Sequence, residues 1–224
     1  MNKEICKKNT MVNLKHLNYL EEIINVVNDT KIDGSIVECG VWKGGCCMWM
    51  LNCQKKYNMD RKFYLYDTFE GMTKPDSSKD DPKALEIYNN TISKTYNRNY
   101  DKWHGENKWA YAPLDFVKNN IDKVNYNNDN IIYVKGDVCK TLDYNVPNKI
   151  SILRLDTDWY DSTKKELDIL FPIVSKNGYI IVDDYYTWKG SKVATDEFMK
   201  KHKDNVEVID KNTTGEIYVI KKLI

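Results

Sequence analysis

Apolar side chains recur at two different spacings along the 224 residues of this chain. Between residues 14 and 27 they stand three and four positions apart, which is the period of a helix. Later in the chain, short apolar runs end at a glycine or at an acid, which is typical of strands buried in a sheet. The first pattern therefore predicts a helix that covers one side of the sheet formed by the second.

Strands and helices alternate over most of the sequence. The segment SIVECG, residues 35–40, predicts a strand that ends in a glycine-rich turn, and a helix follows from Gly45 to about Tyr57. Six further strands are predicted at residues 62–67, 130–134, 150–156, 178–184, 206–210 and 215–222. Further helices are predicted at residues 114–121, 162–175 and 191–202, the second of them beginning at a capping box formed by Thr163 and Glu166.

This alternation predicts an α/β fold with a seven-stranded, mostly parallel sheet and helices on both faces. The last two strands follow each other closely, which indicates an antiparallel hairpin at one edge of the sheet and thus an antiparallel C-terminal strand. We expect one domain, residues 1–224, with an N-terminal helical segment at 1–30. Residues 71–112 show no clear apolar period, so we interpret them as a lid or substrate-binding insertion.

Composition excludes several classes of protein. With 42% hydrophobic and 30% charged residues the chain is neither disordered nor a membrane protein by composition. The 34 basic and 33 acidic residues give a net charge of +1, which favours neither nucleic acid nor anionic lipid as a partner. No apolar run marks a signal peptide or a membrane span, and the six cysteines lack zinc-site spacing, so we expect a cytoplasmic protein with reduced thiols.

The first candidate site is the glycine-rich turn ECGVWKGG, residues 38–45. Gly40 allows a tight turn, and Gly44 with Gly45 would let the backbone approach a ligand before the helix begins. Trp42 occupies a position where a dinucleotide fingerprint needs glycine, so NAD is disfavoured. A structural turn remains the alternative, but Asp67 ends the second strand, where a carboxylate can accept hydrogen bonds from ribose hydroxyls.

The second candidate site is a group of acids at two later strand ends. Asp156 ends one strand, and the pair Asp183 and Asp184 ends the next. Carboxylates that converge there repel one another unless a hard divalent cation such as Mg²⁺ binds them. The pair Asp80 and Asp81 lies in the insertion instead, where a helix cap or a solvated loop is the expected role.

These segments together resemble one known family. The motifs TM, VECGVWKGG, DTFEG, LRLDTDWYDST, GYIIVDDY and DEF, in this order from about residue 10 to residue 222, look like the macrocin O-methyltransferases, which methylate deoxysugars of antibiotics. The resemblance breaks only across residues 74–111. It implies a Rossmann-like class I methyltransferase fold, S-adenosylmethionine on the loop after the first strand, and Mg²⁺ or another divalent cation held by Asp156, Asp183 and Asp184.

By the same matching, the residues expected to bind the cofactor are Met11, Glu38, Gly40, Val41, Gly44, Gly45, Asp67, Thr68, Asp137 and Asp156. Glu38, Gly40 and Asp67 would contact the methionine and ribose parts, Asp137 would lie on the adenine side, and Met11 would close over the cofactor. Methyl transfer also needs a base that takes the proton of the acceptor hydroxyl. Asp158, two residues beyond Asp156, is the expected base, with His104 in the insertion as the alternative.

The expected acceptor is a sugar hydroxyl on a glycan, a nucleotide-sugar or a glycosylated small molecule. The aromatic residues that would stack on the sugar are Tyr96, Tyr100, Trp103, Trp109, Tyr111, Trp159 and Tyr160, unless they only build a small core under the lid. Three other functions stay open: a metal-dependent glycosyltransferase that uses the DTD segment as its DxD motif, a catechol O-methyltransferase, and a non-catalytic binding protein. A homodimer is the expected assembly.

Overall fold

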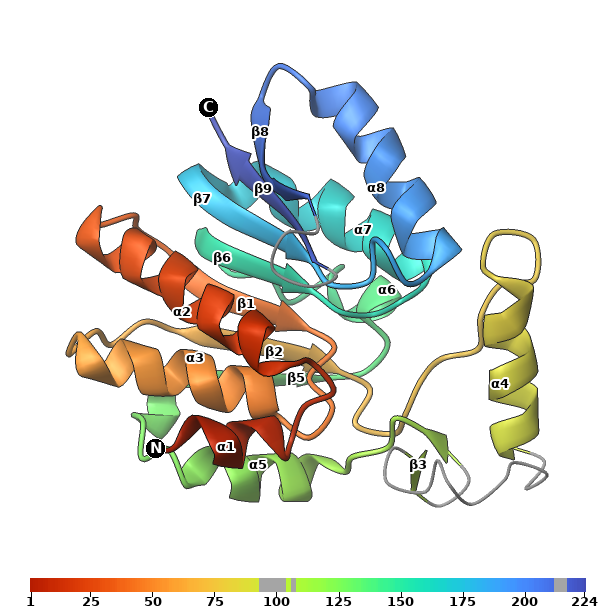
Figure 1. Ribbon diagram of the computed structural model, residues 1–224, viewed down its shortest axis with the longest axis horizontal. Coiled ribbons are helices and arrows are strands. Elements are labelled where there is room, and N and C mark those ends of the chain that lie inside the picture. The colour runs from red at the N-terminus through yellow and green to blue at the C-terminus, as the bar shows by residue number, and fades with distance from the viewer. Residues whose placement is uncertain (93–103, 106–107, 212–216) are drawn as a thin grey trace.

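The computed structural model describes residues 1–92, 104–105, 108–211 and 217–224 (Figure 1). Its helices are α1 (Lys3–Lys7), α2 (Leu14–Asp29), α3 (Gly45–Lys56), α4 (Pro82–Ile92), α5 (Leu114–Asp122), α6 (Val138–Thr141), α7 (Tyr160–Leu170) and α8 (Lys189–His202), with short 3₁₀ turns at Asn128–Asn130 and Phe171–Ile173. Its strands are β1 (Ser35–Cys39), β2 (Phe63–Asp67), β3 (His104–Gly105), β4 (Lys108–Trp109), β5 (Ile131–Lys135), β6 (Ile150–Leu155), β7 (Val174–Val182), β8 (Val206–Lys211) and β9 (Tyr218–Lys222).

Seven strands form one sheet in the order β5-β2-β1-β6-β7-β9-β8. The first five in this order are parallel to one another, and β9 runs antiparallel to both β7 and β8. The chain leaves β1 toward β2 on one side, and β6 lies on the other side, so the direction of winding reverses between β1 and β6. In open α/β sheets this is the point where the carboxyl ends of the strands leave a crevice for a ligand.

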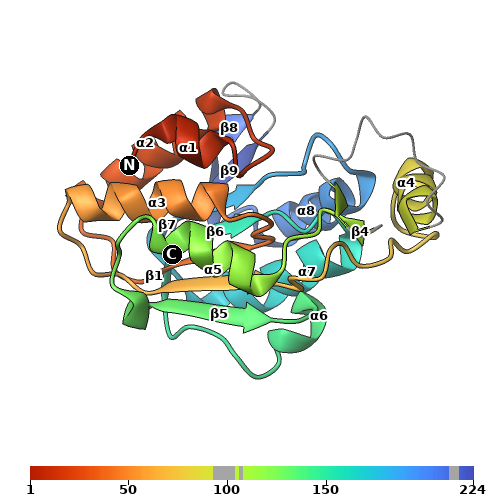
Figure 2. The same cartoon turned by 90° about the horizontal axis from the view of Figure 1, so that it is seen from below.

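Helices cover both faces of this sheet (Figures 1 and 2). Successive residues of a strand point to opposite faces, so Ile36 packs with α2, α3 and α5, whereas Val37 packs with α6, α7 and α8. Both faces of β1 are therefore buried, and its residues from Ile36 to Cys39 are all buried instead of alternating between buried and exposed.

The predicted fold class is confirmed, including the seven strands, the helices on both faces and the antiparallel strand near the C-terminus. Two helices were missed by the sequence pattern. The turn-length helix α6 is too short to show a period, and α4 lies inside the supposedly patternless insertion. Figure 1 shows α4 standing apart from the sheet.

The predicted start of α7 was wrong. The helix begins at Tyr160, whose backbone N–H donates to Asp80 Oδ1 at 2.8 Å, so the cap comes from the insertion and not from Thr163. Glu166 is buried and accepts a hydrogen bond from Thr157 Oγ1 at 2.9 Å. The end of the helix was also wrong, since Val174 already begins β7.

The pair Asp80 and Asp81 has the capping role expected of it. Asp80 is buried and caps α7, and Asp81 Oδ1 accepts the N–H of Lys83 at the start of α4. Within the part of the chain that the structure describes, no helix is long and apolar enough to cross a membrane.

The fold gives a prediction for Gly45, the first residue of α3. Alanine favours a helix over glycine by about 1 kcal/mol, yet a Cβ at Gly45 would lie 2.5 Å from the carbonyl oxygen of Cys6 and 2.6 Å from that of Asn9. We expect Gly45→Ala to lower the free energy of unfolding by about 1–3 kcal/mol, because backbone must move. Chemical denaturation measures it, with Lys56→Ala in the same helix as a control. An unchanged or more stable Gly45→Ala protein would contradict the tight packing of the N-terminal segment on α3.

Candidate active site

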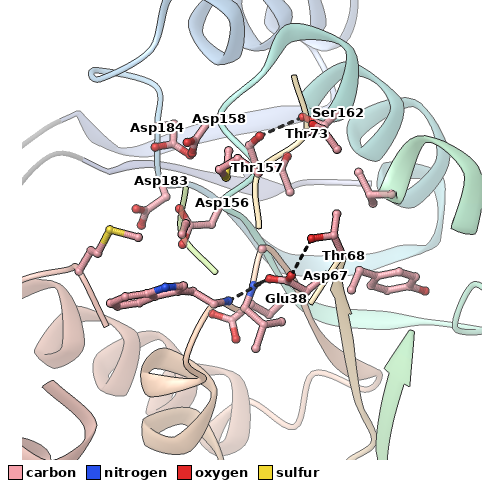
Figure 3. Close-up of a pocket in the computed structure, with 18 of the residues that line it drawn as sticks. Glu38, Asp67, Thr68, Thr73, Asp156, Thr157, Asp158, Ser162, Asp183 and Asp184 are labelled. Atoms are coloured by element: carbon pink, nitrogen blue, oxygen red, sulfur yellow. Dashed lines mark hydrogen bonds between the residues drawn. The ribbon is translucent and has the colours of Figure 1, made fainter. Parts of the chain in front are cut away.

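A cavity of about 320 Å³ opens at the carboxyl ends of the parallel strands, where the direction of winding reverses between β1 and β6 (Figure 3). Its walls come from the loops after β1, β2, β5, β6 and β7, from the segment between α1 and α2, and from both ends of the insertion. Of the residues expected to bind the cofactor or the metal or to act as the base, eleven line it: Met11, Glu38, Gly40, Val41, Asp67, Thr68, Asp137, Asp156, Asp158, Asp183 and Asp184.

Asp67, at the end of β2, organises the glycine-rich loop. Its Oδ2 accepts the backbone N–H groups of Val41 at 2.7 Å and Trp42 at 2.9 Å, and its Oδ1 accepts that of Phe69 at 2.6 Å. Thr68 Oγ1 also lies 3.5 Å from Oδ1, but its hydroxyl has one proton and is 2.6 Å from the carbonyl oxygen of Gly71. Because a carboxylate has about four acceptor positions, Asp67 can accept a ligand hydroxyl while Thr68 donates to Gly71. Burial raises the pKa of Asp67, and the three N–H groups oppose that rise.

Gly40 has a positive φ of +84°, and a Cβ there would lie 1.8 Å from the carbonyl oxygen of Asp156. No other residue fits without moving the loop after β6. Gly44 and Gly45 do not line the cavity, because Gly44 faces α5 and Gly45 faces the carbonyl groups of residues 6 and 9. The expectation that these two glycines let the backbone approach a ligand thus finds no support in the geometry.

Glu38, near the end of β1, is 1% exposed. Its Oε1 accepts a hydrogen bond from Arg154 at 2.9 Å, while its Oε2 is buried without a hydrogen-bond partner among the described residues. Burial raises the pKa of Glu38 to about 8, although the adjacent guanidinium lowers it. An unpaired carboxylate oxygen that lines a cavity is suited to a cationic ligand group.

Arg154 lies at the centre of the acidic rim and is fully buried in β6. Its Nη1 donates to Glu38 Oε1 at 2.9 Å and to Asp156 Oδ2 at 2.7 Å, and its Nη2 donates to Asp183 Oδ1 at 2.8 Å. One guanidinium therefore binds the carboxylates of Glu38 in β1, of Asp156 directly after β6 and of Asp183 directly after β7. Its planar, branched shape makes this possible, whereas a lysine would supply a single point charge.

His16 approaches the same rim from α2. Its Nε2 lies 3.1 Å from Asp183 Oδ1, and its side chain is almost completely buried. Burial and the neighbouring Arg154 lower the pKa of His16 to about 3, so this imidazole is neutral. His16 thus fills space beside Asp183 without adding charge to the rim.

The remaining acids form a tight group. Asp156, Asp158 and Asp184 each present a carboxylate oxygen, and these three oxygens lie within 4.8 Å of one another. Figure 3 shows Asp158 and Asp184 side by side above Asp156 and Asp183. Burial raises the pKa of Asp156 to about 6 and that of Asp158 to about 7, and it raises that of Asp184 well above its usual value.

The carboxyl groups of Asp158 and Asp184 lie close together in this group, and the neighbouring carboxylates add to the effect of burial on the pKa of Asp184, which favours a proton on that carboxyl. The backbone of Asp158 is also strained, with a φ of +68°, which aims its side chain at this group. The metal ligands expected from the sequence were Asp156, Asp183 and Asp184. The tight group in the structure contains Asp158 in place of Asp183. Asp183 lies beside Asp156, but its Oδ1 is held by Arg154.

The alternative base, His104, lies in the short strand β3, and its side chain is outside the described part of the structure. Residues 96, 100 and 103 also lie outside the described residues. Of the other aromatic candidates, Trp109 lines the cavity, whereas Tyr160 donates its hydroxyl to Glu197 on the outer surface.

Arg154, His16 and Trp188 were missed by the sequence analysis, although two of them leave a signal. Arg154 is the single charged residue in the apolar run ISILRL. Because buried charges in proteins are paired, this position indicates a buried acidic partner. His16 lies on the apolar stripe of α2 with Leu17 and Leu20. Trp188 leaves no comparable signal, because it lies in a loop.

Comparison with known proteins agrees with this geometry. A profile described as macrocin O-methyltransferase (TylF) matches residues 6–218. Demethyldecarbamoylnovobiocin O-methyltransferase of Streptomyces niveus is 28% identical over 197 residues, which are 86% of this chain and 68% of the relative. An 8-demethyl-8-(2,3-dimethoxy-alpha-L-rhamnosyl)-tetracenomycin-C 4'-O-methyltransferase of Streptomyces olivaceus is 30% identical over 177 residues, 79% of this chain and 62% of the relative.

Among solved structures, the O-methyltransferase NovP has a similar fold. It superposes with a TM-score of 0.78 and 25% sequence identity, over 96% of this chain and 83% of that chain. The chain thus spans 62% to 68% of the curated relatives reported above and a larger share of the solved structure.

The ion pairs of Arg154 predict a large effect of its removal. We expect Arg154→Met to lower the free energy of unfolding by about 3–5 kcal/mol, because three buried or half-buried carboxylates lose their counter-charge. Chemical denaturation measures this loss, and Lys164→Met, which breaks only an exposed pair with Asp168, should cost less than about 1 kcal/mol. If Arg154→Met were as stable as the unsubstituted protein, the network would not hold the strand ends together.

Proposed function

This chain belongs to the macrocin O-methyltransferase family, and we propose that it transfers a methyl group from S-adenosylmethionine to a hydroxyl group of a sugar, with a divalent cation at the acceptor. The observation that carries the proposal is that one cavity is lined by two sets of acids. Glu38 and Asp67 suit a cationic nucleoside, and the carboxylates after β6 and β7 suit a metal ion. Methyl transfer to a hydroxyl uses both.

The first set of acids fits the cofactor. The unpaired Oε2 of Glu38 would accept the ammonium group of the methionine part, and the remaining acceptor position of Asp67 would take a ribose hydroxyl. Asp137 and Val138 line the cavity beyond Asp67 and would lie along the adenine. Met11, which is half exposed at the rim, would cover the cofactor from the N-terminal segment. When bound, the cofactor supplies the methyl group on a sulfonium centre.

The second set fits a hard divalent cation, because oxygen ligands from several carboxylates are what Mg²⁺ and Mn²⁺ prefer. We assign Asp156, Asp183 and Asp184 as the residues that would hold it. Burial and the neighbouring carboxylates raise the pKa of Asp184 and so favour a proton on it, and a cation would take the place of that proton. Both contacts of Asp183 use Oδ1, so Oδ2 is left for the ion. When bound, the cation stabilises negative charge on the acceptor oxygen.

Asp158 would then take the proton of the acceptor hydroxyl. It is partly buried, lines the cavity and lies in one group with Asp156 and Asp184, whose carboxylate oxygens are within 4.8 Å of one another. Its pKa of about 7 suits a base at neutral pH. Glu166, through the hydroxyl of Thr157, supports the turn that holds Asp158 in its strained conformation.

The acceptor class rests on the relatives. The first is named for O-methylation of demethyldecarbamoylnovobiocin, and the second is named for methylation of a rhamnosyl derivative of tetracenomycin C. A sugar hydroxyl in such a compound is therefore the proposed acceptor of this chain. The expected cytoplasmic location and homodimer stay predictions.

The glycosyltransferase alternative uses the same DTD segment but needs a nucleotide-sugar in the cavity. Isothermal titration of chelator-treated protein separates the two functions. We expect S-adenosylhomocysteine to bind without added metal, and Glu38→Gln to weaken it about tenfold or more because the ammonium group loses a charged partner. Asp168→Asn on the outer surface of α7 is the matched control. Metal-dependent binding of a UDP-sugar, with no binding of S-adenosylhomocysteine, would overturn the proposal.

Two variants separate the base from the cation ligands. We expect Asp183→Asn to weaken Mn²⁺ binding at least about tenfold, because it removes one charged ligand. We expect Asp158→Asn to retain Mn²⁺ binding within about threefold and to lower kcat about 10²-fold or more, as loss of a general base does. Titration calorimetry and turnover with a sugar acceptor measure the two effects. If Asp158→Asn abolished Mn²⁺ binding, Asp158 would be a ligand and the assignment would be wrong.

A further inference from the structure

Three tryptophans from distant parts of the chain meet beside the carboxylates. Trp109 belongs to β4, Trp159 follows Asp158, and Trp188 ends the loop after β7. Their ring centroids are 5.6, 5.8 and 5.7 Å apart, and each pair meets edge to face at 64° to 70°. Edge-to-face packing is the favoured arrangement of aromatic rings, so the three indoles form a rigid cluster.

The members of this tryptophan cluster have different surroundings. Trp159 is 4% exposed, does not line the cavity, and donates its indole N–H to the carbonyl oxygen of Thr73 at 3.0 Å. Trp109 and Trp188 are partly exposed and line the cavity. Trp159 is thus an anchor, and the other two present aromatic surface to whatever enters.

The cluster is tied to the carboxylates through the backbone. The N–H of Trp188 donates to the carbonyl oxygen of Asp184 at 2.9 Å, and Trp159 is covalently next to Asp158. The aromatic surface therefore keeps a fixed position relative to the base and to the proposed cation ligands. Figure 3 shows Thr73, the partner of Trp159, on the same side of the cavity as Asp158 and Asp184.

The cluster also fixes both ends of the insertion. The N–H of Met72 donates to the carbonyl oxygen of Trp109 at 2.8 Å, which joins the beginning of the insertion to its end. Asp80 reaches the N-terminus of α7, and Gly190 leaves room for it, since a Cβ there would lie 1.9 Å from Asp80 Oδ1. The wall of the cavity at the acceptor end is consequently preformed by the insertion and the two acidic loops together.

We propose that Trp188, supported by Trp109, determines acceptor specificity by stacking on the C–H face of one pyranose ring, which presents the hydroxyl of that ring to Asp158. This inference rests on the proposed function. A pyranose has C–H bonds on its faces and hydroxyls around its edge, so an apolar wall beside a group of carboxylates matches both parts of the ring. Trp159 acts as a positioning residue that holds the wall in place.

The test uses saturation-transfer NMR on full-length protein loaded with S-adenosylhomocysteine and Mg²⁺, with methyl α-L-rhamnopyranoside as the probe. We expect irradiation of aromatic protons to saturate the ring C–H protons of the sugar. Trp188→Ala should weaken binding of the probe about tenfold, and Trp188→Phe should keep it within about threefold, because phenylalanine retains an aromatic face. Trp49→Phe, which removes an indole from α3 outside the cavity, is the control.

Turnover gives a second readout. Trp188→Ala should raise KM for the sugar acceptor more than it lowers kcat, while the affinity for S-adenosylhomocysteine stays that of the unsubstituted protein. Equal binding of the probe by Trp188→Ala and the unsubstituted protein, or no aromatic saturation of the sugar in the latter, would overturn the inference. If the unsubstituted protein did not bind S-adenosylhomocysteine, the proposed function itself would be overturned.

Discussion

The architecture of the site depends on the buried guanidinium of Arg154. Parallel strands bring their carboxyl ends to one edge of a sheet, and here those ends carry Glu38, Asp156 and Asp183. Buried carboxylates at such short separations repel one another and lose their hydration, which costs far more than a single hydrogen bond returns. Arg154 supplies charge-assisted hydrogen bonds to all three from within β6. With this residue in place, an acidic edge is compatible with a packed sheet.

The same arrangement divides the rim into two parts with different chemistry. Glu38, Asp156 and Asp183 share the charge of Arg154, whereas Asp158 and Asp184 lie outside its hydrogen bonds, and burial with the neighbouring carboxylates raises the pKa of Asp184. The cation that we propose would bring two further positive charges to Asp156, Asp183 and Asp184. Glu38 lies at the boundary, with one oxygen on Arg154 and the other unpaired in the cavity. The charge of Arg154 is thus shared between two sides of a single cavity, that of Glu38 and that of the acids after β6 and β7.

Most of the sheet and of the cofactor side could be predicted from the sequence, because both depend on local pattern. A strand of apolar residues that ends at an acid is visible without any structure, and eleven of the residues predicted for the cofactor, the metal or the base do line one cavity. The errors arose where distant segments decide the outcome. The cap of α7 is Asp80, eighty positions from Tyr160, and no local signal at Thr163 could exclude its own side chain as the cap. Gly44 and Gly45 were assigned to a ligand because the sequence cannot show that α5 and the N-terminal segment pack against them.

On the acceptor side, too, the sequence could not show which distant segments meet, and there these segments form the wall that the proposed sugar would contact. The tryptophan cluster joins residues 109, 159 and 188, and the hydrogen bond of Trp159 reaches back to Thr73, so four separate segments form one wall. Such a wall can change by substitution in any one segment while the strand ends that suit the cofactor stay as they are. The relatives are named for acceptors as different as demethyldecarbamoylnovobiocin and a rhamnosyl tetracenomycin, yet the family profile spans residues 6–218 of this chain. A fold that keeps its strand ends and changes this wall can transfer the same group to different acceptors.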